Sequence, residues 1–127
     1  MSGSGARPAV LMTGAYPQWD MDALANQYDL LCLFDPAEKR AELEKNRAKI
    51  RAIATRGDLG ANAELMASLP NLEIVSVFGV GTDSVDLAYA RSHNIKVTNT
   101  PDVLTDDVAD IAVALLLATA RHVPQGD

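Results

Sequence analysis

The chain has 127 residues, of which 48% are hydrophobic and 22% are charged. This balance predicts one soluble globular domain with a hydrophobic core and excludes a disordered, collagen-like or disulfide-stapled chain. Eleven basic and seventeen acidic residues give a formal net charge of −6, so no basic field is present to attract nucleic acid, and no nucleic-acid partner is expected. The longest apolar stretch, 111–120, is about half of the ~20 residues that a bilayer crossing needs, so no membrane span is expected.

The first residues and the single cysteine each carry a separate indication. Residues 1–7 begin Met-Ser-Gly-Ser-Gly, which is typical of a flexible leader left by cloning. The single cysteine, Cys32, cannot form a disulfide within the chain, and it lies in the apolar run 28–34. This position predicts a buried thiol in a reducing compartment, such as the cytoplasm.

Five apolar segments alternate with five segments that have helical features. The expected strands are 8–13, 28–34, 51–55, 72–78 and 95–99. Their continuous apolar character predicts strands that are buried on both faces of a parallel sheet. The expected helices are 19–27, 36–50, 62–69, 84–93 and 105–122. Strand and helix in regular alternation predict a doubly wound α/β domain with right-handed crossovers.

Polar residues mark the expected helix starts. Asp35 stands before Pro36, a good combination of N-cap and first helical residue. Asp83 or Ser84 is the expected N-cap of the fourth helix, and Thr105 that of the last. Acidic side chains at 106 and 107 then favour a helix N-terminus through the helix dipole.

The last helix is apolar around most of its circumference. One stripe consists of Val108, Ile111, Ala112, Leu115, Leu116 and Thr119, and small or apolar residues fill most of the rest. A helix of this kind is normally buried on nearly every side, whereas a five-stranded domain covers only one side of it. We therefore expect self-association through residues 104–122, by helix exchange between two copies, or cover by a second domain. The alternative is a helix that folds back as the missing fifth helix of the domain.

The most informative motif is Phe78-Gly79-Val80-Gly81-Thr82-Asp83. Two glycines directly after a strand allow a ligand to approach the backbone closely, and the amides near Val80 and Gly81 would form a small anion site. The motif is not a dinucleotide fingerprint, because Ser84 stands where the third glycine should be. The residues alone leave two interpretations open: a carboxylate site, or a tight turn that binds nothing.

Two further loops follow strands at the same edge of the sheet, where α/β domains place their ligands. One is 99–106, after the fifth strand, where Thr105 either caps the last helix and does nothing more or belongs to the site. Arg56, with Gly57 after it, follows the third strand, and it either pairs with a substrate carboxylate or forms a surface ion pair with Asp58. The two histidines, His93 and His122, have no Ser, Cys or acid at triad spacing. We find no complete acid–base machinery and no metal-binding cluster in the sequence.

From about residue 52 onward the sequence resembles the N-terminal part of the D-isomer-specific 2-hydroxyacid dehydrogenases, especially the glyoxylate and hydroxypyruvate reductase branch. The segments that carry the resemblance are Ala54-Thr55-Arg56-Gly57, 69–76, Gly79-Val80-Gly81-Thr82-Asp83 with Val85-Asp86, 95–105 and the helix from Asp107. Residues 8–50 fit the family only by the order of strands and helices.

The resemblance implies a flavodoxin-like substrate domain over residues 8–103, with a five-stranded sheet of order 2-1-3-4-5. It assigns the substrate carboxylate to the amides of Val80 and Gly81. Phe78 and Gly79 would form the approach, with Arg56 and Gly57 nearby. Residues 104–127 would form the helix that crosses to a nucleotide-binding domain, which makes Thr105 and Val108 neighbours of the NAD(P)H nicotinamide.

The family's nucleotide fingerprint, its catalytic Arg, Glu and His, and the segment that returns to complete the substrate domain are not in the sequence. We therefore expect part of an NAD(P)H-dependent oxidoreductase that reduces small 2-oxo acids to D-2-hydroxy acids, with no cofactor binding and no turnover by this chain alone. The first alternative is an inactive flavodoxin-like scaffold. A flavin-binding or phospho-receiver module is disfavoured, because the first two strands end without the required phosphate loop or paired acids.

Overall fold

The computed structural model describes residues 6–33 and 36–122, with the backbone alone for 36–40. Five parallel strands form one sheet: β1 (Ala9–Met12), β2 (Asp29–Cys32), β3 (Ile50–Arg56), β4 (Ile74–Phe78) and β5 (Lys96–Thr98). Their order is β2-β1-β3-β4-β5, which confirms the predicted α/β class and strand order. Because all strands run the same way, their carboxyl ends share one edge of the sheet.

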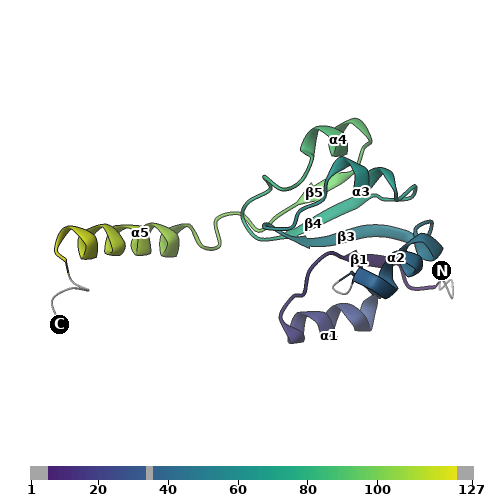
Figure 1. Cartoon of the computed structure of the whole chain (residues 1–127), viewed down its shortest axis with the longest axis horizontal. Helices are drawn as coiled ribbons and strands as arrows, with labels where there is room; N and C mark the ends of the chain where they lie inside the picture. Colours follow the sequence, from purple (N-terminus) through teal and green to yellow (C-terminus); the bar gives the residue numbers. More distant parts are fainter. Residues whose placement is uncertain (1–5, 34–35, 123–127) are drawn as a thin grey trace, which may run out of the picture.

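Each strand is followed by a helix. The helices are α1 (Gln18–Gln27), α2 (Pro36–Asn46), α3 (Ala63–Ala67), α4 (Leu87–Ser92) and α5 (Thr105–Ala120). Figure 1 shows α3 and α4 on one side of the sheet and α1 on the other. The α3 side holds the larger core, in which Ile53, Val75 and Met66 are almost inaccessible to solvent. This burial of branched side chains on both β3 and β4 is what fixes the register of the two strands that carry the site.

The other side of the sheet is only half covered. Helix α1 packs over β1 and β2, where Val10 and Met12 are buried. Beyond it, Ser76 and Thr98 point to the same face from paired positions of β4 and β5 and are exposed. A groove of about 460 Å³ lies along this face, lined mainly by apolar side chains that include Tyr16, Leu24, Tyr28, Ala52, Ala54 and Ile74.

Two predicted helix caps are wrong. Helix α4 begins at Leu87, and its N-cap is Asp86, whose carboxylate accepts a hydrogen bond from the Tyr89 amide at 2.9 Å. The helix starts later than predicted because residues 84–86 pair in extended form with Ala61, through Ala61 N to Ser84 O (3.1 Å) and Asp86 N to Ala61 O (3.0 Å). Helix α5 begins at Thr105, but its N-cap is Leu104 and no side chain caps it. The expected cap at Asp35 lies outside the described residues.

Two smaller expectations are also corrected. Helix α2 ends at Asn46 instead of 50, because Ile50 is the first residue of β3 and is fully buried in the core. Cys32 is only partly buried, since β2 is the edge strand and has a neighbour on one side alone.

Helix α5 has no buried residue. Its leucines at 115, 116 and 117 keep 61%, 68% and 59% of their surface exposed. Figure 1 shows the helix extending away from the sheet at the end of the 99–104 loop. The alternative in which this helix folds back onto the domain is therefore wrong. Across the described residues, no helix has both the length and the apolar character to span a bilayer.

Candidate functional site

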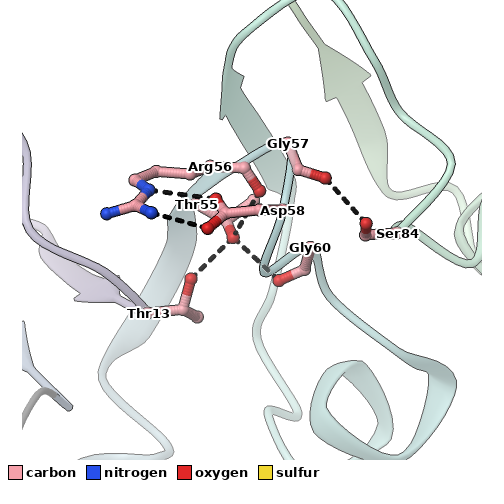
Figure 2. A network of polar contacts seen from close by, with 7 residues as sticks. All are labelled: Thr13, Thr55, Arg56, Gly57, Asp58, Gly60 and Ser84. Carbon is pink, nitrogen blue, oxygen red and sulfur yellow. Dashed lines mark hydrogen bonds and ion pairs between the residues drawn. The ribbon is translucent and has the colours of Figure 1, made fainter.

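The loops at the carboxyl edge of the sheet are tied together by buried hydroxyl groups. Thr13, just after β1, donates its hydroxyl to the hydroxyl of Thr55 in β3 at 2.6 Å. Thr55 is fully buried and donates in turn to the carbonyl of Gly60 at 2.8 Å, as Figure 2 shows. Because a buried hydroxyl is costly unless it is hydrogen-bonded, this chain holds the β1 and β3 ends in one arrangement.

The loops after β3 and β4 lie in direct contact. Ser84 donates its hydroxyl to the Gly57 carbonyl at 2.7 Å. A Cβ on Gly57 would lie 3.3 Å from the Gly81 carbonyl oxygen, which is tighter than an ordinary contact. Gly79 has a φ of +148°, a conformation that other residues rarely adopt. The structure therefore brings Gly57 together with the glycine loop 79–81, as the sequence resemblance implied.

The loop after β5 holds the glycine loop from its other side. Asn99 donates its side-chain amide to the Val80 carbonyl at 2.8 Å, and the Thr100 amide donates to the Gly79 carbonyl at 2.9 Å. The carbonyls of Gly79 and Val80 are thereby paired. Within the described part of the chain, the amides of Val80 and Gly81 donate to no acceptor, and both residues are exposed. Two adjacent amides without an acceptor, on a fixed loop, can both donate to one carboxylate.

The same loop does not fit the pyrophosphate of a dinucleotide. Helix α4 begins at Leu87, five residues beyond Thr82, so the loop does not run directly into a helix N-terminus, as a dinucleotide-binding loop does. The Asp83 carboxylate lies 3.7 Å from the position that a Cβ on Gly81 would occupy. Its negative charge opposes a diphosphate more strongly than a single carboxylate.

Arg56 does not reach the glycine loop. Its guanidinium pairs with Asp58, with Nε to Oδ1 at 3.0 Å and Nη2 to Oδ2 at 2.5 Å, and both side chains are exposed. This hydrogen-bonded pair lowers the pKa of the Asp58 carboxyl below its usual value. Figure 2 shows the guanidinium and the Gly57 carbonyl pointing to opposite sides of β3. Of the two sequence interpretations of Arg56, the surface ion pair is the one that the structure displays.

An aromatic pair stands next to the glycine loop. The rings of Tyr16 and Phe78 are 4.9 Å apart between centroids, at an interplanar angle of 32°. Tyr16 donates its hydroxyl to the Thr55 carbonyl at 2.8 Å, and burial raises its pKa to about 12. The sequence analysis missed Tyr16 and Thr13. Their signal was position alone, since each lies beyond the carboxyl end of β1.

The remaining candidates lie apart from this edge. Thr105 and Val108 are exposed on α5, which extends away from the sheet. His93 caps the C-terminus of α4 and stacks on Tyr89, with 3.9 Å between ring centroids, and His122 follows α5. Among the side chains that the structure describes, no group of three His, Cys, Asp or Glu could hold a metal ion.

Comparisons with known proteins agree on one family. The family model for the D-isomer specific 2-hydroxyacid dehydrogenase, catalytic domain, matches residues 10–123. A glyoxylate/hydroxypyruvate reductase A from Arabidopsis thaliana is 44% identical over 118 residues, which are 93% of this chain and 38% of that protein.

Solved structures give the same result. A 2-hydroxyacid dehydrogenase from Ketogulonicigenium vulgare Y25 superposes with a TM-score of 0.85 at 48% identity, covering 95% of this chain and 38% of that one. The NADPH-dependent glyoxylate/hydroxypyruvate reductase of Sinorhizobium meliloti, in complex with NADP and malonate, superposes with a TM-score of 0.74 at 35% identity, covering 95% and 39%. The chain therefore spans about two fifths of the length of each of these relatives.

Proposed function

The chain belongs to the D-isomer-specific 2-hydroxyacid dehydrogenase family, and we propose that it forms the substrate-binding part of an NAD(P)H-dependent reductase that converts small 2-oxo acids to D-2-hydroxy acids. Glyoxylate and hydroxypyruvate are the preferred candidates, because the similar protein from Arabidopsis thaliana is a glyoxylate/hydroxypyruvate reductase. The similar structure from Sinorhizobium meliloti holds malonate, which is also a small carboxylic acid.

One observation carries the proposal. Within the described residues, the Val80 and Gly81 amides donate to no acceptor, while the Val80 and Gly79 carbonyls accept from Asn99 and Thr100. Uncharged hydrogen-bond donors can bind a small carboxylate that stays partly solvated. Two adjacent N–H groups supply such donors. Gly57 and Gly79 carry no side chain, so a ligand can approach the backbone at these two positions. In this proposal Phe78 and Gly79 form the approach to the bound acid.

In this proposal the glycine loop is not the site of the cofactor, because it carries Asp83 and does not lead directly into a helix. In the whole reductase, we place Thr105 and Val108 of α5 beside the nicotinamide of NAD(P)H, as the family resemblance implies. The chain alone mixed with glyoxylate and NADPH should oxidise no cofactor above the blank.

Two further properties belong to the proposal. The exposed apolar surface of α5 supports self-association through residues 104–122, because burying it against a second copy removes apolar area from water. The single cysteine, Cys32, favours a reducing compartment such as the cytoplasm.

The test is a titration of the ¹⁵N-labelled chain with glyoxylate, oxalate and glycolate, followed by amide chemical shifts. We expect saturable shifts at Val80 to Asp83 and none in α3, whose amides serve as the internal reference. The flavodoxin-like scaffold without a ligand predicts no saturable shift at any of these amides, and that result would refute the carboxylate site.

A further inference from the structure

We propose that helix α5 of a second copy of the chain docks in the apolar groove on the half-covered face of the sheet, and that two copies exchange their α5 helices in this way. This inference rests on the self-association in the proposed function. It adds the surface that receives the helix, which is the groove lined by α1, β3 and β4.

The floor of the groove consists of small side chains. Successive residues of a strand point to opposite faces of the sheet, and on β3 and β4 the large residues Ile53 and Val75 are fully buried on the α3 side. The residues between them, Ala52, Ala54 and Ser76, line the groove instead. A floor of small residues lets an element with large side chains approach the sheet closely.

Helix α5 carries large apolar side chains with nothing packed on them. Val108, Ile111 and Leu115 follow one another at helical spacing, and each keeps more than half of its surface exposed. At 100° per residue, Asp106 and Asp110 lie on the opposite side of the helix from Val108 and Leu115. The apolar side can therefore dock while these two carboxylates stay in water.

The helix and the groove also agree in length and area. Helix α5 has 16 residues and β3 has 7, which correspond to about 24 Å and about 23 Å. A helix of this length and about 10 Å width covers the strand from end to end. Two exchanged helices form this contact twice, so both copies together bury roughly 1,000 Å² or more, which is the size that a specific interface needs.

The position of α5 favours a second copy as its source. Figure 1 shows α5 extending away from the sheet of its own chain, and none of its residues is buried there. The helix and the groove are thus both uncovered and lie apart within one chain. Reciprocal exchange between two copies covers both surfaces in a closed two-fold dimer.

The experiment detects the second copy's helix directly. A Cys32→Ser chain with Asp110→Cys carries a nitroxide label on the polar side of α5, and it is mixed with ¹⁵N-labelled Cys32→Ser chain. Broadening of amide signals by a nitroxide falls steeply with distance. We expect the strongest intermolecular broadening at Ala54 and Ser76, and weaker broadening in α4, which lies on the other side of the sheet.

A pair of arginine substitutions tests the groove without changing α5. Ser76→Arg places a charge on the groove floor, so the dissociation constant of the dimer should rise about tenfold or more in sedimentation equilibrium. Ser92→Arg makes the same change at an exposed position of α4 and should leave the constant within about twofold of wild type. Amide spectra report whether each variant keeps its fold.

The other outcomes separate this inference from the rest of the proposal. Broadening confined to α5, or equal effects of the two arginines, would show that the helices pair with each other, so self-association would be kept and docking in the groove refuted. A wild-type monomer without intermolecular broadening would refute both. The carboxylate site is tested independently, because the glyoxylate titration reads the amides of Val80 to Asp83.

Discussion

The hydroxyl of Thr13 donates to the hydroxyl of Thr55 at 2.6 Å, which joins the ends of β1 and β3 across 42 positions of sequence. Thr55 uses its own proton for the Gly60 carbonyl at 2.8 Å. One buried side chain thus fixes the start of two loops at the candidate site, and a substitution there tests how much the loop arrangement depends on it.

Thr55→Val keeps the shape of the side chain but removes both hydrogen bonds. The Thr13 hydroxyl and the Gly60 carbonyl are left without their partner, so we expect the free energy of unfolding to fall by about 1–3 kcal/mol. Thr98→Val is the control, because Thr98 is exposed on the edge strand β5 and should change stability by less than about 0.5 kcal/mol. Urea denaturation gives both values, and equal effects would show that the buried chain of hydroxyls contributes nothing.

Two glycine-to-alanine substitutions separate fold from ligand binding. A Cβ on Gly60 would lie 1.9 Å from the Ser84 carbonyl oxygen, and its φ is +63°. Gly60→Ala should therefore cost about 2–3 kcal/mol of stability. At Gly81 the nearest atom would be 3.7 Å away, so Gly81→Ala should keep the fold but weaken glyoxylate binding, since its methyl group occupies the approach to the amides. Denaturation and amide-shift titration measure the two effects, and normal glyoxylate affinity in Gly81→Ala would place the ligand elsewhere.

The fold could be predicted from the sequence because its signals are local and repeated. Continuous apolar runs gave all five strands, and the order of strands followed from the family resemblance. Helix starts were less predictable. Asp83 and Ser84 are good caps by residue type, but Ser84 is committed to Gly57 and the backbone at 84–86 pairs with Ala61. Because of that long-range pairing, α4 begins only at Leu87. Local sequence patterns do not predict such a pairing.

The candidate site was predicted only in part, for a related reason. The contact between Gly57 and Gly81 follows from two loops at one sheet edge, which the parallel topology requires. The direction of Arg56 does not follow from topology, because a neighbouring carboxylate, Asp58, captures the guanidinium on the other side of β3. Tyr16 was missed because its role depends on a contact with Phe78, which lies 62 positions later in the sequence. The spacing of residues in a sequence does not reveal such a contact.

Tyr16 should ionise at unusually high pH. Its hydroxyl is partly buried, and this desolvation raises its pKa from 10.0 to about 12. A raised folded-state pKa means that neutral Tyr16 stabilises the fold fully below pH 10 and that this stabilisation is lost as pH rises towards 12. Ultraviolet titration of the three tyrosines should show one late ionisation. Tyr16→Phe should abolish that phase, and a late phase that persists in this variant would contradict its assignment to Tyr16.

The ion pair at Arg56 predicts an acid-side effect. Arg56 lowers the pKa of Asp58 below its usual 3.8, so the pair contributes stability above that pH and loses it as pH falls through the folded-state pKa. Arg56→Gln should raise the Asp58 pKa towards 3.8, measured by carboxyl ¹³C shifts, and high salt should act in the same direction because the pair is exposed. Arg47→Gln, which removes the pair with Glu44 on α2, should leave Asp58 unchanged.

The same Arg56→Gln variant decides between the two interpretations of this residue. If Arg56 stays with Asp58 when an acid binds, glyoxylate affinity at the Val80 and Gly81 amides should remain within about twofold of wild type, since an exposed charge at a distance is screened. A tenfold loss would correspond to about 1.4 kcal/mol and would show that the guanidinium changes partner to the substrate carboxylate.

Helix α5 predicts self-association that a single charge should weaken. Leu116 is 68% exposed and Ile111 is 57% exposed, so pairing two copies would bury a few hundred Å² of apolar surface. At ~25 cal/mol per Å² this is several kcal/mol before the entropy of association is subtracted. Leu116→Asp would place a charge in that contact, where it is costly to desolvate.

Sedimentation equilibrium should show a dimer for the wild type and a shift towards monomer for Leu116→Asp. Ala23→Asp, an equal charge change at an exposed position of α1, should not alter the dimer, because α1 already packs on its own sheet. A wild-type chain that sediments as a monomer with α5 still helical would mean that exposed leucines at these positions do not bring two copies together.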